Sequence, residues 1–201
     1  WQEREHHLFG WDLLDIPARF DRFQEGLEII TRLLENEEPT TLEGEYYQLR
    51  GGVLLPRPAR PGGPPLLVGG NGPRRTLPLA ARYADEWNAV YIPLDGYRER
   101  SARLDELLRE RGRAPEDVRR SLMTGCFFGR TPEEVEERIR KHGSGDKSPA
   151  EYGEDGLVVG TPEDVCRQLE EMEEAGLQRV MLQWLDLDDL NGLRALAEAV
   201  V

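Results

Sequence analysis

Short apolar segments alternate with amphipathic helices through most of the chain, and this alternation constrains the fold more than any other feature. The run at 65–68 (PLLV) is unbroken, as is typical of a strand covered on both faces in a parallel sheet. Further strands are predicted at 87–92, 120–128 and 179–184, each separated from the next by helical sequence. Alternation of this kind predicts an α/β fold with right-handed crossovers, either doubly wound or a (β/α) barrel. Since a complete barrel usually needs about 250 residues, four parallel strands correspond to half of one.

The region before the first of these strands has a different organisation. Apolar residues recur at spacings of three and four over 16–35, which predicts an amphipathic helix that begins at Pro17. Glu43-Gly44 interrupts two short strand-like segments and predicts a hairpin or short excursion. The Pro/Gly-rich stretch 56–65 is predicted to stay extended, because proline excludes a helix there.

Helix starts are well marked in the second half of the chain. Thr131-Pro132 and Thr161-Pro162 each combine an N-cap threonine with proline at the first helical position and acidic residues after it. The segment 141–155 between these two helices is polar and Gly/Ser-rich, which predicts a loop, and a final helix is predicted from about 189 to 200.

Composition excludes several classes of partner. The 201 residues carry 26 basic and 39 acidic side chains, a net charge of −13, so the surface repels nucleic acid and anionic membranes. No apolar run approaches the roughly 20 residues of a membrane span. Cys126 and Cys166 form no CxxC pair, so neither a disulfide framework nor a zinc finger is indicated, and we expect a cytoplasmic protein.

A glycine-rich turn is the strongest candidate for a binding site. Gly69, Gly70, Asn71 and Gly72 lie where a predicted strand leads into a helix, a position at which the backbone can approach a ligand and free N–H groups favour an anion. Pro73 is predicted in the first turn of that helix, and Arg74 and Arg75 add positive charge in an acidic chain. The alternative is a tight turn without a ligand, because the segment matches neither GxGxxG nor a Walker loop.

Other candidate residues have simpler explanations. The serines occupy no G-x-S-x-G elbow, no metal-ligand spacing is present, and Cys126 fits core packing better than catalysis. Acidic residues after the last strand could reach an active site or cap the next helix: Asp186, Asp188, Asp189. Trp87 and Trp184 could form the floor of a flat cofactor pocket or be buried between sheet and helices. We assign no catalytic residue and no metal site.

Several segments together resemble the bacterial luciferase-like monooxygenase superfamily, in particular its branch that uses the deazaflavin coenzyme F420. The resemblance covers nearly the whole chain and includes RFDRFQEGLEIITRLL, LEGEYYQL and GTPEDVCRQLEEMEEAGLQRVMLQW. Its most specific parts are the G-G-x-G that follows the PPLLV strand and the A-x-x-Y-A-D-E-W-N run after it.

The resemblance implies a TIM (β/α)8 barrel in which a deazaflavin lies at the carboxyl ends of the strands and exchanges a hydride with a small organic substrate. It implies that the glycine-rich turn holds the phosphate end of the cofactor, that the loop from Trp1 lines the same pocket, and that Asn88 faces it. The implied cofactor-binding residues are Gly69, Gly70, Asn71, Gly72, Arg75, Asn88 and Trp1. An FMN-dependent monooxygenase of the same fold is the alternative enzyme.

The chain departs from this pattern because the first four barrel strands have no counterpart in it. We therefore expect residues 1–201 to form a single luciferase-like domain that covers about the C-terminal half of a barrel. A half-barrel exposes two open strand edges, which a stable protein must pair or cover. A homodimer is expected on this ground, and the alternative is an N-terminal segment that precedes Trp1. A non-catalytic relative that binds a flavin-like ligand, or none, is a further alternative.

Overall fold

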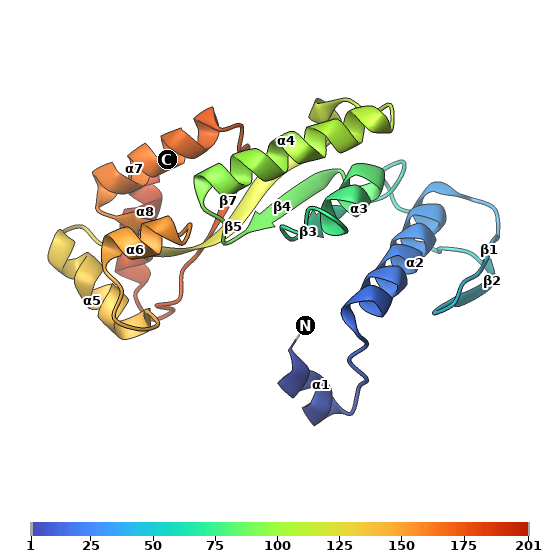
Figure 1. Cartoon of the computed structure of the whole chain (residues 1–201), viewed down its shortest axis with the longest axis horizontal. Coiled ribbons are helices and arrows are strands. Elements are labelled where there is room, and N and C mark those ends of the chain that lie inside the picture. Colours follow the sequence, from blue (N-terminus) through green and yellow to red (C-terminus); the bar gives the residue numbers. More distant parts are fainter. Residues whose placement is uncertain (1, 201) are drawn as a thin grey trace. The chain divides into compact units, whose positions relative to one another are not determined.

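The computed structural model describes residues 2–200, which form two compact units that divide between Pro65 and Leu66 (Figure 1). Each unit is described separately. That both act as one luciferase-like domain stays a prediction.

The first unit contains the predicted long helix and hairpin. Its elements are α1 (Glu3–Phe9), α2 (Ile16–Glu35), β1 (Thr40–Glu43) and β2 (Gln48–Gly52), with β1 and β2 antiparallel. Asp15 caps α2, its carboxylate accepting from the Ala18 N–H at 2.9 Å, and Pro17 lies in the first turn. The helix prediction for 16–35 is therefore confirmed, with the N-cap one residue before it.

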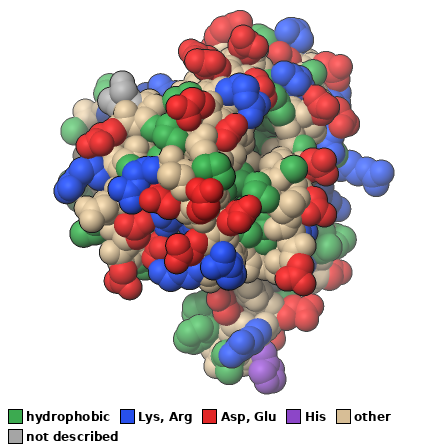
Figure 2. Space-filling model, turned by 90° about the vertical axis from the view of Figure 1, so that its left-hand side faces the viewer, with side chains coloured by type: hydrophobic (Ala, Val, Ile, Leu, Met, Phe, Trp, Pro, Cys, Tyr) green, Lys and Arg blue, Asp and Glu red, His purple; other side chains and the backbone are tan. Residues whose placement is uncertain are grey.

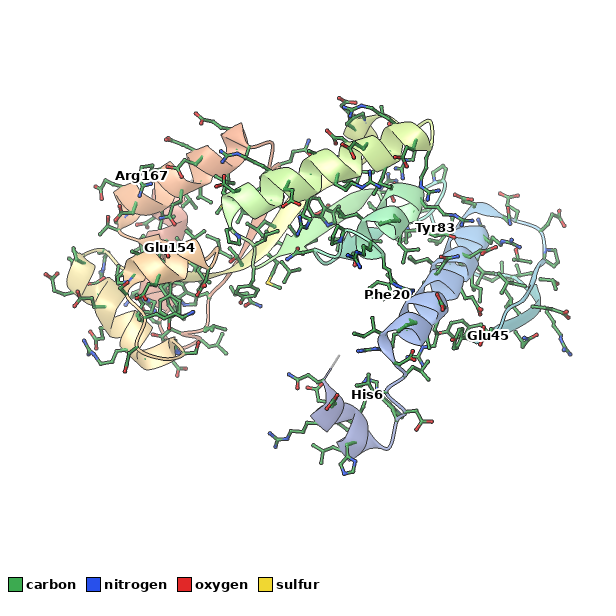
Figure 3. All side chains as sticks on the ribbon, viewed as in Figure 1. His6, Phe20, Glu45, Tyr83, Glu154 and Arg167 are labelled. Atoms are coloured by element: carbon green, nitrogen blue, oxygen red, sulfur yellow. The ribbon has the colours of Figure 1, made fainter. Side chains whose placement is uncertain are left out.

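One carboxylate holds the hairpin turn against α2. Glu25 accepts hydrogen bonds from the backbone N–H groups of Glu45, Tyr46 and Tyr47 at 2.8, 2.9 and 3.1 Å. In Figure 3 Glu45 lies beside α2. A Cβ at Gly44 would collide with this carboxylate, so a larger residue there would displace Glu25 from the turn. Desolvation raises the pKa of Glu25, but the three N–H donors outweigh it and lower the pKa overall.

The second unit is an α/β unit with five strands. Its elements are β3 (Leu67–Gly69), α3 (Thr76–Tyr83), β4 (Glu86–Val90), α4 (Leu94–Glu110), a 3₁₀ turn (Pro115–Asp117), β5 (Arg119–Phe128), α5 (Pro132–His142), α6 (Pro149–Glu154), β6 (Val158–Gly160), α7 (Pro162–Glu174), β7 (Arg179–Gln183) and α8 (Leu190–Val200).

All strand pairs of this sheet are parallel. β3 pairs with β4 and β4 with β5, while the long β5 pairs with β7 through 121–125 and with β6 through 126–128. The four predicted strands are present, and the structure adds a fifth, β6, that sequence reasoning missed. Its three residues are too few for a periodic signal, and the Gln168 side chain acts as an additional partner, bonding both the N–H and the C=O of Val159.

The predicted loop at 141–155 is wrong in its second half, where α6 forms. Ser148 and Glu151 build a capping box at its start, and Tyr152 is buried in a cluster with Phe127 and Ile139. Six helical residues give too little periodicity to distinguish from a polar loop, although Ser-Pro-x-Glu is a helix-start signal.

Two faces of the sheet differ in their contacts. Trp87 and Ala89 of β4 and Leu122 of β5 are buried on the outer face, against α3 and α4, which lie along that side (Figure 1). The Trp87 ring stacks on Tyr97 of α4 with centroids 5.8 Å apart. Because side chains alternate along a strand, the intervening residues form the opposite face. This inner face is defined here by Asn88, Ser121 and Met181, and the Asn88 side chain contacts the other two.

The surface is charged and mixed in sign. The face drawn in Figure 2 shows acidic and basic side chains interspersed. No helix within residues 2–200 combines the length and apolarity that crossing a bilayer requires.

Replacing Glu25 with Gln should loosen the hairpin turn. The folded pKa of Glu25 is lowered, so its stabilising contribution is present above the unfolded pKa of about 4.3 and is lost as the pH falls through the folded value. Hydrogen exchange followed by mass spectrometry should show several-fold faster exchange of the amides of 45–47 in Glu25→Gln at pH 7, and a smaller difference from the wild type at acidic pH. Glu28→Gln on the same helix is the control, and equal exchange in the two variants would contradict the prediction.

Candidate functional site

The carboxyl ends of the parallel strands lie at one edge of the sheet, here named the carboxyl edge. Parallel pairing brings the turn after β3, Tyr91 after β4, and Gln183 at the end of β7 to this edge. In open α/β sheets and in barrels this is the edge at which ligands bind.

The glycine-rich turn is joined to β4 by backbone hydrogen bonds. The Gly70 N–H donates to the Asn88 carbonyl at 2.9 Å, and the Trp87 indole N–H donates to the Gly70 carbonyl at 2.9 Å. Gly70 has a φ of +119°, a conformation open to glycine and strained for other residues. The turn is thereby fixed in position before any ligand binds.

Asn71 fixes the turn with its side chain. Its Nδ2 donates to the Val90 carbonyl at 2.6 Å and its Oδ1 accepts from the Val90 N–H at 2.9 Å. The amide therefore extends β4 as a strand partner would. These two bonds hold the Asn71 side chain against β4, so the donors that it can still offer a ligand are its backbone N–H and the second N–H of Nδ2.

The helix after the turn starts later than expected. The sequence predicted Pro73 in its first turn, whereas α3 begins at Thr76, with Arg75 as N-cap and 73–75 forming a separate turn. Pro78 is the physical reason, because proline lacks the N–H needed beyond the first helical turn. Arg75 is exposed at the helix start, and its side chain makes no capping hydrogen bond.

The turn has the properties of an anion site. Within residues 2–200 the N–H groups of Asn71 and Gly72 donate to no protein acceptor. A Cβ at Gly69 would meet only the Asn88 carbonyl oxygen, at 3.9 Å, so a ligand can approach the backbone closely. Arg100 of α4 donates from Nε to the Asn71 carbonyl at 3.2 Å, and its guanidinium also pairs with Glu99 at 2.6 Å. These residues fit a phosphate group.

Asn88 lies on the inner face, below the carboxyl edge. Its Nδ2 donates to the Ser121 hydroxyl at 2.9 Å and lies 3.9 Å from the Met181 sulfur. Only 6% of Asn88 is exposed. The structure thus links Gly70 and Asn88 directly, through the backbone, and places the Asn88 side chain among polar and thioether groups of β5 and β7.

Two residues at the carboxyl edge were not predicted from sequence. The Tyr91 hydroxyl donates to Oε1 of Gln183, which connects the end of β4 to the end of β7 across β5. The only signal that could have found them is position, because both lie where strands of an α/β sheet end. Trp1 lies outside the described residues.

The acidic residues after β7 have structural partners. Asp189 accepts from the Gly192 N–H at 2.8 Å and from Arg138 at 2.7 Å, and Asp186 binds Arg138 and Lys141. The hydrogen bond from Lys141 lowers the pKa of Asp186, and that from Arg138 lowers the pKa of Asp189. The Asp189 contact confirms the capping alternative for that residue.

The remaining candidates are packed. Trp87 is fully buried, and the Arg138 guanidinium covers the Trp184 ring at 4.1 Å from its centroid, so neither ring is free to form a pocket floor on its own. Cys126 is 5% exposed, and burial raises the pKa of its thiol to about 12, which confirms core packing.

Comparison with known protein families identifies this architecture. A family described as luciferase-like monooxygenase matches residues 1–147. The chain belongs to this family. The resemblance inferred from sequence is therefore confirmed.

Curated relatives align with part of the chain. An F420-dependent glucose-6-phosphate dehydrogenase of Microbacterium testaceum is 33% identical over 115 residues, which cover 54% of this chain and 32% of the relative. A phthiodiolone/phenolphthiodiolone dimycocerosates ketoreductase of Mycobacterium kansasii is 30% identical over 120 residues, covering 59% and 32%. The match thus spans about a third of the length of these curated relatives.

Solved structures in the family share the fold. An F420-dependent secondary alcohol dehydrogenase in complex with an F420-acetone adduct superposes with a TM-score of 0.77 at 19% identity, over 94% of this chain and 64% of that one. A long-chain alkane monooxygenase superposes with a TM-score of 0.75 at 19% identity, over 97% of this chain and 58% of that one. The second unit is thus the α/β sheet of luciferase-like TIM-barrel enzymes.

Replacing Asn71 with Ala should destabilise the second unit. The Val90 N–H and C=O would both lose their partner, at a cost of about 1–3 kcal/mol in the free energy of unfolding. Urea denaturation measures the loss, with Asn191→Ala on the exposed surface of α8 as control. A stability equal to that of the control would show that the side-chain pairing with Val90 contributes nothing.

Proposed function

We propose that the protein is an oxidoreductase that transfers a hydride between the deazaflavin coenzyme F420 and a small alcohol or carbonyl substrate. The observation that carries this proposal is the pre-ordered turn Gly69–Gly72 at the carboxyl edge, with N–H groups available to an anion.

Family membership and the activities of relatives support the cofactor and the reaction. Two of the relatives described above are named as an F420-dependent dehydrogenase and a ketoreductase, both of which act at a carbon that carries oxygen. A bound deazaflavin would supply the hydride chemistry, and the protein would supply binding and orientation.

In this proposal different residues of the chain bind different parts of the cofactor. The N–H groups of Asn71 and Gly72 hold the phosphate end of the cofactor, with Arg75 at the start of α3 contributing positive charge. Asn88 faces the cofactor from the inner face, and Trp1 completes the proposed set. The protein acts in the cytoplasm on a small molecule.

A carboxylate in the turn should oppose binding of the phosphate. Gly70→Asp is expected to weaken F420 binding at least about tenfold, equivalent to 1.4 kcal/mol, while Gly70→Asn, of the same shape without the charge, should weaken it much less. Titration followed by deazaflavin absorbance measures both. Equal effects of the two substitutions would leave backbone strain at the positive φ as the cause and remove the phosphate role.

The same titration with FMN distinguishes the alternative enzyme. A wild-type protein that binds FMN and not F420 would replace the hydride-transfer proposal by an FMN-dependent monooxygenase. A protein that binds neither would overturn both.

The sheet edges support a homodimer as part of the proposal. Within the described residues β3 has only β4 as a strand partner and β7 only β5, so each offers an unpaired backbone edge. We expect light scattering after size exclusion to give twice the 22.9 kDa mass of the chain. A monomer at micromolar concentration would contradict this part of the proposal and leave the cofactor assignment unaffected.

A further inference from the structure

Tyr91 has a backbone conformation that its side chain does not favour. Its φ of +43° is the only positive value among the non-glycine residues of 2–200. A bulky residue in this region is an outlier that persists only when its surroundings over-determine it.

Contacts on both sides hold Tyr91 in place. Its N–H donates to the Met123 carbonyl of β5 at 3.0 Å, and the preceding residue, Val90, is fixed by the Asn71 side chain. The Tyr91 backbone is thus locked to the same turn that forms the proposed phosphate site.

The Tyr91 ring occupies space that a glycine leaves open. A Cβ at Gly125 of β5 would lie 3.4 Å from Cε1 of Tyr91 and 3.1 Å from Cδ2 of Leu157. The phenol thus passes over β5 in van der Waals contact with the position of Gly125 and reaches Gln183 on β7. Even so, 41% of Tyr91 stays exposed, so the ring is not a core residue.

The pair formed by Tyr91 and Gln183 has unused hydrogen-bonding capacity. The phenol donates its proton to Gln183 Oε1, which leaves the phenol oxygen as an acceptor. Within residues 2–200 the Gln183 Nε2 group donates to no protein acceptor, so its N–H donors are available. An acceptor and a donor thus lie next to each other at the carboxyl edge, where Gln183 is in register with Gly125 of β5, two residues beyond the pair Met123 and Met181.

We propose that Tyr91 and Gln183 bind the oxygen of the substrate. A hydroxyl group donates to the phenol oxygen and accepts from the Gln183 carboxamide, whereas a carbonyl oxygen accepts from Gln183 alone. This inference rests on the proposed function, because it assigns the alcohol and carbonyl forms of the substrate to one pair of residues in the same site.

The alcohol and carbonyl forms of the substrate allow a test that distinguishes substrate binding from a purely structural role of Tyr91. Propan-2-ol and acetone are the probes, and saturation-transfer NMR measures their binding to the wild type without requiring turnover. Tyr91→Phe removes only the phenol oxygen and should weaken propan-2-ol about three- to tenfold while leaving acetone unchanged. Gln183→Glu removes the N–H donors and should weaken both probes.

Controls separate this inference from folding and from the cofactor assignment. Tyr47→Phe, a tyrosine of the hairpin with the same 41% exposure, should change neither affinity. The affinity for F420 should stay within about twofold of the wild type in Tyr91→Phe, since one lost hydrogen bond elsewhere does not touch the phosphate turn.

Each outcome decides a different claim. Three results would overturn the role of the pair. The Tyr91→Phe variant could bind propan-2-ol and acetone as tightly as the wild type does, or bind both more weakly by the same factor. The third result is that the wild type binds neither probe. If the variants change the affinities for propan-2-ol and acetone as expected but the wild type does not bind F420, the proposed function is overturned and Tyr91 and Gln183 remain an alcohol-binding site.

Discussion

The pairing of Asn71 with Val90 is the interaction on which the carboxyl edge depends. A side-chain amide that bonds both the N–H and the C=O of one residue continues the pairing beyond β3, where the glycine-rich turn would otherwise leave β4 without a partner on the β3 side. The turn keeps backbone freedom for a ligand, and the strand beside it stays fixed. The same contact also holds the peptide before Tyr91, so one side chain orders both the anion-binding turn and the unusual backbone next to it.

The two faces of the sheet carry different physical properties. The outer face is closed against α3 and α4, with Trp87 stacked on Tyr97 and no exposed surface on either. A charged contact on this face is internal, where the buried Arg120 pairs with Asp105 of α4 at 2.6 Å. The inner face is graded along the strands: Glu86 pairs with Arg179 at the amino ends, Asn88 bonds Ser121 in the middle, and Tyr91 with Gln183 stands at the carboxyl edge. The ion pair between Glu86 and Arg179 holds the amino ends of the strands together. The residues at the carboxyl edge can therefore bind a ligand while the sheet stays in place.

Sequence patterns were sufficient to predict the elements that have a long amphipathic segment or clear capping residues. The helix at 16–35 and the helices that follow Thr131 and Thr161 were predicted because apolar spacing and capping residues act locally. β6 and α6 were missed because three and six residues carry too little periodicity. Their stability comes from contacts that the local sequence does not reveal: Gln168 bonds the backbone of β6, and Tyr152 of α6 packs against Phe127. The glycine-rich turn was found because its signal is local. Tyr91 and Gln183 were not, because 92 residues separate them and only the register of β4, β5 and β7 brings them together.

The engaged state of Asn71 changes how the glycine-rich turn should be understood. Three glycines around one asparagine suggest four ligand contacts, yet the Asn71 amide is committed to β4 and the Gly70 N–H to the Asn88 carbonyl. What remains for an anion is chiefly the backbone N–H of Asn71 and of Gly72, while Arg100, which is ion-paired with Glu99, orients the turn through its bond to the Asn71 carbonyl. Few donors held rigidly lose less entropy on binding than many flexible ones. The turn therefore combines a small donor set with a fixed geometry, and the glycines serve the approach of a ligand to the backbone rather than the mobility of the loop.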